Sequence, residues 1–76
     1  MEAKKTLDAR GLSCPMPVLK TKQAMDEIAD GEVLEVLATD PGAKSDIAAW
    51  AKRTGNALLE TTETDGVFGF YLRKGT

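Results

Sequence analysis

The chain has 76 residues, of which 42% are hydrophobic and 29% are charged, and its formal net charge is −2. This balance is typical of one small globular domain and excludes both a disordered chain and a nucleic-acid binder held by excess positive charge. The chain has no histidine and a single cysteine, Cys14, which excludes an internal disulfide and leaves too few ligands for a zinc site, so we expect no metal.

Turn-forming residues divide the chain into six predicted elements. Residues 5–9 alternate between polar and apolar side chains, which predicts a short strand. Residues 15–29 predict a helix, with Gly31 as its left-handed cap. Residues 32–39 are apolar on both faces, which predicts an internal strand.

A second helix is predicted to begin near Pro41, with Asp40 as the candidate N-cap and Ser45 as a rival. Trp50 falls on its inner side at helical spacing, and Gly55 provides its C-cap.

The last two predicted elements are strands at residues 56–64 and 67–74. They flank Asp65-Gly66, a strong signal for a two-residue hairpin turn. The register that follows pairs Thr61 with Phe70 and Leu59 with Leu72. It places Leu59 on the inner face of the sheet.

The order strand, helix, strand, helix, strand, strand predicts an α/β two-layer sandwich that forms one domain over residues 1–76. Crossovers between parallel strands are right-handed, so both helices should cover one face of a four-stranded mixed sheet. Such a fold has no deep crevice between its layers, and we expect any chemistry at a surface edge.

The chemically informative stretch is Cys14-Pro15-Met16-Pro17. A residue before proline avoids the helical region, so Cys14 is expected to be the N-cap of the first helix. The positive end of that helix and the N–H of Met16 should then stabilise a thiolate and lower the pKa of Cys14. The alternative is that Cys14 is a passive, partly buried small hydrophobe.

The charges near Cys14 are unevenly distributed. Between Ala9 and Met25 there are three cations, Arg10, Lys20 and Lys22, and no acid. Lys20 and Lys22 should lie about 9–12 Å along the helix from Cys14. They are candidates for docking an acidic partner surface.

These motifs resemble those of the TusA/SirA-like sulfur carriers over nearly the whole chain. The family's Cys-Pro-x-Pro hallmark is matched by residues 14–17, and its Leu-Asp-x-Arg-Gly-Leu pattern by residues 7–12. The Gly-Glu-x-Leu-x-Val run is matched by residues 31–36, the Thr-Asp-Pro turn by residues 39–41, and the aromatic of the second helix by Trp50.

The resemblance implies a mixed sheet with strand order 1-2-4-3 and a persulfide formed on Cys14, with no cofactor. It implies a cysteine desulfurase or rhodanese as donor. The acceptor would belong to tRNA 2-thiouridine synthesis, molybdenum-cofactor assembly or sulfur oxidation. By matching position, Arg10, Pro15, Pro17 and Asp40 would support the site, and Met16 joins them through its N–H.

Two other function classes stay open at this point: an RNA-binding module with an initiation-factor-like fold, and a thiol redox protein. The negative charge disfavours the first, and the absence of a second cysteine disfavours the second. We expect a carrier that acts between partner enzymes rather than a stand-alone enzyme. No signal peptide or membrane-spanning stretch is visible, so we expect a cytoplasmic protein with no membrane and no direct nucleic-acid partner.

Overall fold

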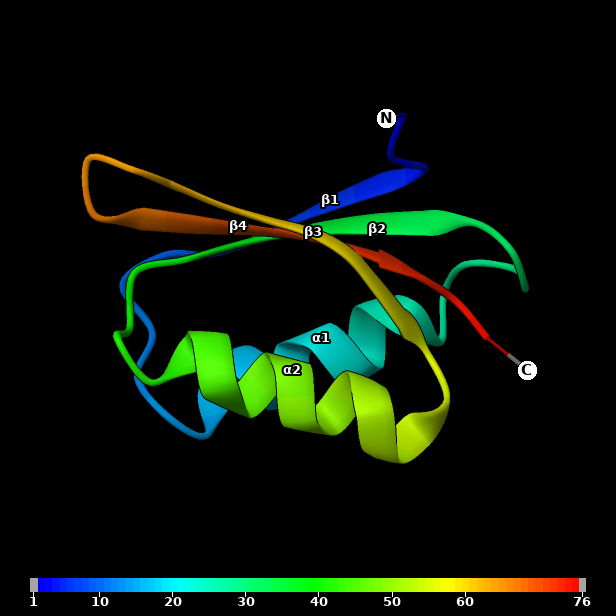
Figure 1. Cartoon of the computed structure of the whole chain (residues 1–76), viewed down its shortest axis with the longest axis horizontal. Helices are drawn as coiled ribbons and strands as arrows, with labels where there is room; N and C mark the ends of the chain where they lie inside the picture. The colour runs from blue at the N-terminus through cyan, green and yellow to red at the C-terminus, as the bar shows by residue number, and fades with distance from the viewer. Residues whose placement is uncertain (1, 76) are drawn as a thin grey trace.

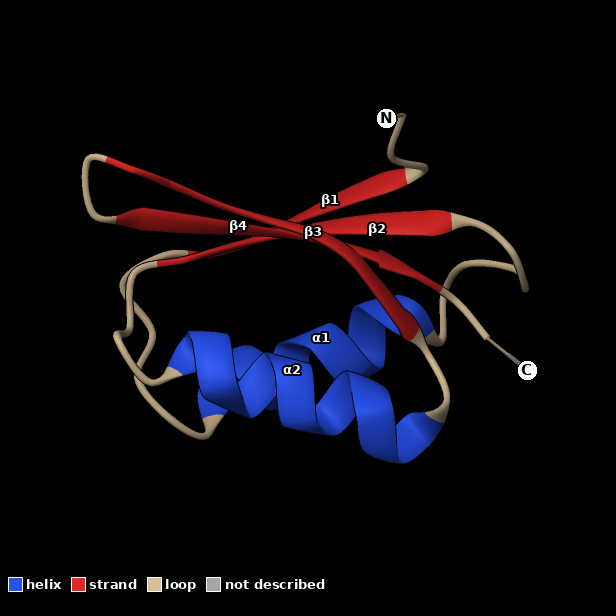
Figure 2. Cartoon of the chain, viewed as in Figure 1, coloured by secondary structure: helices blue, strands red, loops and turns tan. Residues whose placement is uncertain are grey.

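The computed structural model describes residues 2–75 and shows a sheet covered on one face by two helices (Figures 1 and 2). The strand order is β1-β2-β4-β3; β1 and β2 are parallel, and the other neighbours are antiparallel. The predicted element order, two-layer architecture and strand order are confirmed. The elements are β1 (Lys5–Ala9), α1 (Met16–Met25), β2 (Val33–Ala38), α2 (Ala43–Thr54), β3 (Ala57–Thr64) and β4 (Val67–Arg73).

The core lies between the sheet and the helices, and the two inner strands supply its centre. Leu34, Val36 and Ala38 of β2 are fully buried at every second position, as the pleat of an internal strand requires. Phe70 and Leu72 of β4 complete this layer and are also fully buried. The side chains on the opposite face of β2 are half-buried, so that face of the sheet is the more open one.

Each helix covers the sheet with one stripe of buried side chains. In α1 the stripe includes Thr21, whose buried hydroxyl donates a hydrogen bond of 2.7 Å to the Pro17 carbonyl and is thereby satisfied. In α2 it includes Trp50, which is 6% exposed, so its predicted inner position is confirmed. Gly55 caps α2 in the left-handed conformation, also as predicted. None of the described helices is long and apolar enough to cross a membrane.

Helix α1 is shorter than predicted, because it ends at Met25 rather than at residue 29. The Glu27 N–H bonds to the Ala24 carbonyl at 3.0 Å, which tightens the chain into a turn instead of continuing the helix. Gly31 has φ +86° but does not cap α1. It lies in the turn before β2 and donates its N–H to the Lys74 carbonyl at 2.9 Å.

The hairpin between β3 and β4 has the predicted two-residue turn. Asp65 and Gly66 both adopt positive φ, +52° and +80°, as a type I′ turn requires. The predicted pairing of Thr61 with Phe70 is also confirmed.

The predicted register also places Glu60 opposite Tyr71, which is confirmed, but beyond Glu60 it is wrong. A β-bulge lets Leu58 lie opposite Leu72 and leaves Leu59 without a partner. Leu59 is 37% exposed, whereas Leu58 packs against the core. The bulge therefore exchanges the expected roles of these two adjacent leucines.

This exchange leads to a stability prediction. Leu58→Ala should destabilise the protein by about 1–2 kcal/mol, because it removes core contacts from a half-buried side chain. Leu59→Ala should change the free energy of unfolding by no more than about 0.5 kcal/mol, as an exposed substitution does. Urea unfolding of both variants checks this, and a larger loss at Leu59 would show that the bulge is absent.

Candidate functional site

Cys14 lies in the loop from β1 to α1, at the end of the molecule where both helices begin (Figure 1). Its side chain is exposed. Gly11 adopts φ +81° in this loop and donates its N–H to Thr39 Oγ1 at 2.9 Å. Because Thr39 follows β2, this hydrogen bond ties the loop that carries Cys14 to the loop that precedes α2.

Cys14 is not the N-cap of α1, so that prediction is wrong. The N-cap is Pro15, and the Cys14–Pro15 peptide bond is cis. The N–H of Met16 donates to the Ser13 carbonyl at 2.9 Å, and Pro17 has no N–H. The Met16 N–H, which was expected to reach the sulfur, therefore bonds to Ser13 instead. Pro17 is also fully buried, so it packs against the core in addition to stiffening the turn.

Two carboxylates from the second βα unit lie beside the start of α2. The N-cap of that helix is Gly42 and makes no side-chain cap, so neither Asp40 nor Ser45 caps it as predicted. Asp40 instead accepts the Ala43 N–H at its backbone carbonyl, at 3.0 Å. A β-carbon built on Gly42 would lie 3.5 Å from Asp40 Oδ2 and 3.6 Å from Asp46 Oδ2. The Asp40 and Asp46 carboxylates therefore both lie close to Gly42.

These acids affect the pKa of the Cys14 thiol. A hydrogen bond from Cys14 to the Asp46 carboxylate raises the pKa of the thiol, and desolvation and the charges of Asp46 and Asp40 act in the same direction. The expectation of a lowered pKa is wrong, because the acid-free segment around Cys14 meets acids from a distant part of the chain. Sequence reasoning missed Asp46, although parallel strands bring both helix starts to one edge of the sheet.

Arg10 does not supply a free positive charge to the sulfur. Its guanidinium makes a two-pronged contact with Asp8, with Nε–Oδ1 at 2.8 Å and Nη2–Oδ2 at 2.9 Å. The Arg10 N–H also donates to Asp8 Oδ1 at 3.1 Å. These bonds lower the pKa of Asp8 to about 2. Arg10 and Asp8 thus fix the start of the loop and neutralise each other.

The exposed side of α1 next to Cys14 carries apolar and basic side chains. Met16 and Leu19, one turn apart, are 38% and 46% exposed. Lys20 is half-buried, and the exposed Lys22 forms an ion pair with Asp26 at 3.7 Å. Leu19 is a surface feature that the sequence analysis did not single out.

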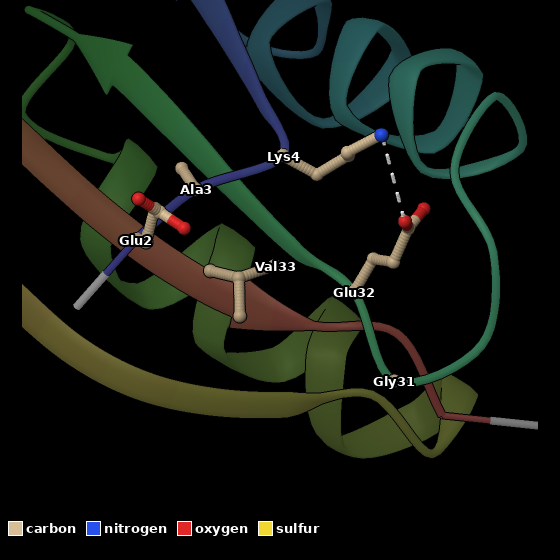
Figure 3. A pocket seen from close by; sticks show the side chains of 6 residues that line it. All are labelled: Glu2, Ala3, Lys4, Gly31, Glu32 and Val33. Atoms are coloured by element: carbon tan, nitrogen blue, oxygen red, sulfur yellow. Dashed lines mark ion pairs between the residues drawn. The ribbon is translucent and has the colours of Figure 1, made fainter.

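The hollow shown in Figure 3 lies away from this site. It has a volume of about 300 Å³ and is lined by the segment before β1 and the turn before β2, where Lys4 approaches Glu32 at 3.9 Å. These segments lie at the edge of the sheet opposite the one that Cys14 follows. Among residues 2–75 there is also no group of three or more acidic or cysteine side chains that could hold a metal ion. Cys14 is exposed and does not line this hollow.

Residues 5–74 match the family model described as "Sulfurtransferase TusA". The chain belongs to the TusA family. The putative sulfur carrier protein YrkI of Bacillus subtilis is 51% identical over 75 residues, which cover 99% of this chain and 100% of that protein. The sulfur carrier protein TusA of Allochromatium vinosum is 48% identical over 68 residues, 90% of each chain.

A solved structure supports the same assignment. The SirA-like protein from Desulfitobacterium hafniense superposes with a TM-score of 0.83 and is 31% identical, covering 95% of this chain and 99% of that one. The family and the fold that the sequence motifs indicated are therefore confirmed.

The contact with Asp46 predicts the pH at which the thiol ionises. Because negative charge beside the sulfur favours the neutral thiol, the reactive thiolate should appear only at a pH above the ordinary cysteine value. The alkylation rate of Cys14 measured against pH should rise with a midpoint above that of a cysteine peptide. A midpoint at or below that of the peptide would contradict the role given to the carboxylates.

Proposed function

We propose that this TusA-family chain is a sulfur carrier that holds sulfane sulfur as a persulfide on Cys14 and relays it between a donor protein and an acceptor protein. The observation that carries this proposal is the placement of the chain's single cysteine. Cys14 is exposed, and it is the first residue of the Cys-Pro-x-Pro motif. Relatives with about half of their residues identical are named sulfur carrier proteins, which supports the same role.

The transfer needs no oxidant or reductant. In loading, the Cys14 sulfur attacks the terminal sulfur of a donor persulfide, R–S–SH, and a new S–S bond forms as the donor's S–S bond breaks. The electron pair of the broken bond leaves with the donor thiolate, which takes up the proton that Cys14 has lost. In unloading, an acceptor thiolate attacks the terminal sulfur on Cys14, and Cys14 leaves as the thiolate.

The neighbouring residues have supporting roles in this proposal. Arg10 holds the loop through Asp8, and the prolines at positions 15 and 17 stiffen the start of α1. Met16 offers exposed apolar surface beside the sulfur. Asp40 contributes negative charge to the thiol.

An open surface suits a carrier better than a stand-alone enzyme. Catalysis on a free small molecule needs groups arranged around the reacting atom in a site that excludes water, whereas Cys14 is exposed. A carrier needs only a sulfur that two proteins can approach in turn. Donors of the cysteine desulfurase or rhodanese class fit this scheme. So do acceptors in tRNA thiolation, molybdenum-cofactor assembly or sulfur oxidation, in the cytoplasm.

The open face of the sheet gives no support to RNA binding. Glu35 accepts hydrogen bonds of 3.0 Å from Thr6 and from the Tyr71 hydroxyl, and Glu60 lies opposite Tyr71 on β3. A tyrosine held between carboxylates is a poor platform for a polyanion. A thiol redox cycle within the chain would need a resolving cysteine, and the sequence has none.

The proposal predicts where sulfur is found after loading. The wild-type protein incubated with a persulfide donor should gain the mass of one sulfur atom, and a reductant should remove it. Cys14→Ser should gain none, because no other thiol exists in the chain. Intact-mass spectrometry decides this, and equal loading of both proteins would refute the carrier function.

Lys20 and Lys22 are proposed to dock acidic groups on a partner. Changing both to glutamate should lower the rate of sulfur transfer from a cysteine desulfurase or rhodanese, because it replaces attraction by repulsion. The matched control changes Lys52 and Arg53 to glutamate. Both side chains are exposed in the last turn of α2, at the end of the molecule away from Cys14. Equal losses in both double variants would show only a general effect of net charge.

A further inference from the structure

The loop that carries Cys14 contains two tight turns. The first is closed by a hydrogen bond of 3.3 Å from the Leu12 N–H to the Ala9 carbonyl, and the second by one of 2.9 Å from the Met16 N–H to the Ser13 carbonyl. Each bond joins residues three positions apart, so it fixes the shape of its own turn. Neither bond fixes where the loop lies relative to the rest of the protein.

One backbone donor of this loop reaches a distant segment. Gly11 has φ +81°, as the third residue of a type II turn requires, and the N–H at that position is not used to close the turn. It donates instead to Thr39 Oγ1 at 2.9 Å, across 28 positions of the chain. Within residues 2–75, the other backbone N–H groups from residue 10 to residue 16 that donate a hydrogen bond do so to acceptors within residues 8–13. The loop's backbone is thus attached to a distant segment through Thr39.

Thr39 is well placed to hold the loop. It follows directly after β2, an inner strand whose alternate side chains are fully buried, and it is itself half-buried. β1 and β2 are parallel, and Ala9 lies opposite Ala38 as the last pair of their ladder. The bond between Gly11 and Thr39 lies just beyond this pair, where both loops leave the sheet at the same end of the molecule (Figure 1). It therefore ties the Cys14 loop to the buried centre of the sheet.

Sulfur transfer makes strict demands on the position of this loop. The attacking sulfur must approach the terminal sulfur of the persulfide to roughly 3–3.5 Å, and a displacement of about 1 Å can lower the rate about a hundredfold. In the proposed function a partner docks on α1, whereas Cys14 lies in the exposed loop before that helix. The two sulfur atoms therefore meet only if the loop keeps a fixed position relative to the docking surface.

We propose that Thr39 is a positioning residue for sulfur transfer: its hydroxyl oxygen holds the Gly11 N–H and thereby sets where Cys14 is presented to a partner protein. This inference rests on the proposed carrier function and adds a residue to it. Thr39 acts through Gly11, three residues before Cys14, and takes no part in the bonds that form and break. Loading and unloading of sulfur therefore keep the same balance of bonds and protons.

The test compares substitutions that remove or keep the acceptor oxygen at position 39. Thr39→Val has nearly the same shape but no oxygen, whereas Thr39→Ser keeps the hydroxyl. Because Gly11 is exposed, water can accept its N–H in the valine variant, so the domain should remain folded. The matched control is Thr54→Val, which removes a hydroxyl that donates to the Trp50 carbonyl at 2.7 Å, at the end of α2 away from Cys14.

The first measurement is the rate of sulfur transfer to Cys14 from a protein donor, with the concentration of the carrier varied. The donor is a cysteine desulfurase or a rhodanese, whichever loads the wild type faster. Thr39→Val should lower the maximal rate about tenfold and change KM by no more than about twofold, because the docking surface is intact while the sulfur is misplaced. Thr39→Ser and Thr54→Val should each stay within about twofold of the wild type.

Two further measurements show the cause of a lower rate. Hydrogen exchange of the Gly11 amide, followed by NMR, should be about tenfold faster in Thr39→Val and unchanged in Thr39→Ser, because only the valine variant removes the acceptor. Alkylation of Cys14 by iodoacetamide should stay within about twofold in every variant, because a small reagent reaches an exposed thiol wherever the loop lies. A change in alkylation as large as the change in transfer would place the effect in the chemistry of the thiol and contradict a positioning role.

The outcomes separate this inference from the function on which it rests. A Thr39→Val protein that loses protection at Gly11 yet accepts sulfur at the wild-type rate overturns the inference alone. An equal loss of rate in Thr39→Ser or in Thr54→Val also overturns it, because packing or stability would then be the cause. If Thr39→Val is unfolded by circular dichroism, Thr39→Ala, which also lacks the oxygen, is compared with Thr39→Ser instead. A wild-type protein that gains no sulfur on Cys14 from either donor overturns the proposed function itself.

Discussion

A single hydrogen bond, 2.9 Å long from the Gly11 N–H to Thr39 Oγ1, joins the two loops on which the site depends. Because β1 and β2 are parallel, both loops leave the same edge of the sheet and both helices begin there. The surroundings of Cys14 are therefore built by two segments that are far apart in the sequence. The Cys-Pro-x-Pro motif supplies the sulfur, and the second βα unit supplies its charge.

Two opposing electrostatic effects act on the pKa of the Cys14 thiol: the positive start of α1 lowers it, and the nearby carboxylates raise it. The start of an α-helix carries about half an elementary positive charge, whereas each ionised carboxylate carries a full negative charge. The helix end is weakened further here, because the Met16 N–H is bonded to Ser13 and Pro17 has no N–H. The effect of Asp46 therefore outweighs that of the helix end, and the pKa of the Cys14 thiol is raised.

Features with strong local signals could be predicted from the sequence. Alternation in β2, the Asp65-Gly66 turn and the Gly55 cap each depend on neighbouring residues, while the strand order came from the family resemblance. Features that depend on distant segments could not. No local pattern marks the bulge at Leu59, and the early end of α1 follows from turns and contacts made after it. The effect of Asp46 on Cys14 could not be predicted for the same reason, because the two residues approach each other only once both βα units have folded together.

The surface around the starts of the two helices carries opposite charges, with Lys20 and Lys22 on α1 and with Asp40 and Asp46 beside the start of α2. A partner that complements both must carry acidic and basic groups side by side. Such a surface fits in one orientation, because a half-turn would place like charges together. Orientation matters more than affinity for a carrier, since the two sulfur atoms must meet within bonding reach and the complex must then separate. A uniformly basic surface would bind many acidic proteins in many poses, whereas a divided surface selects the pose that transfers sulfur.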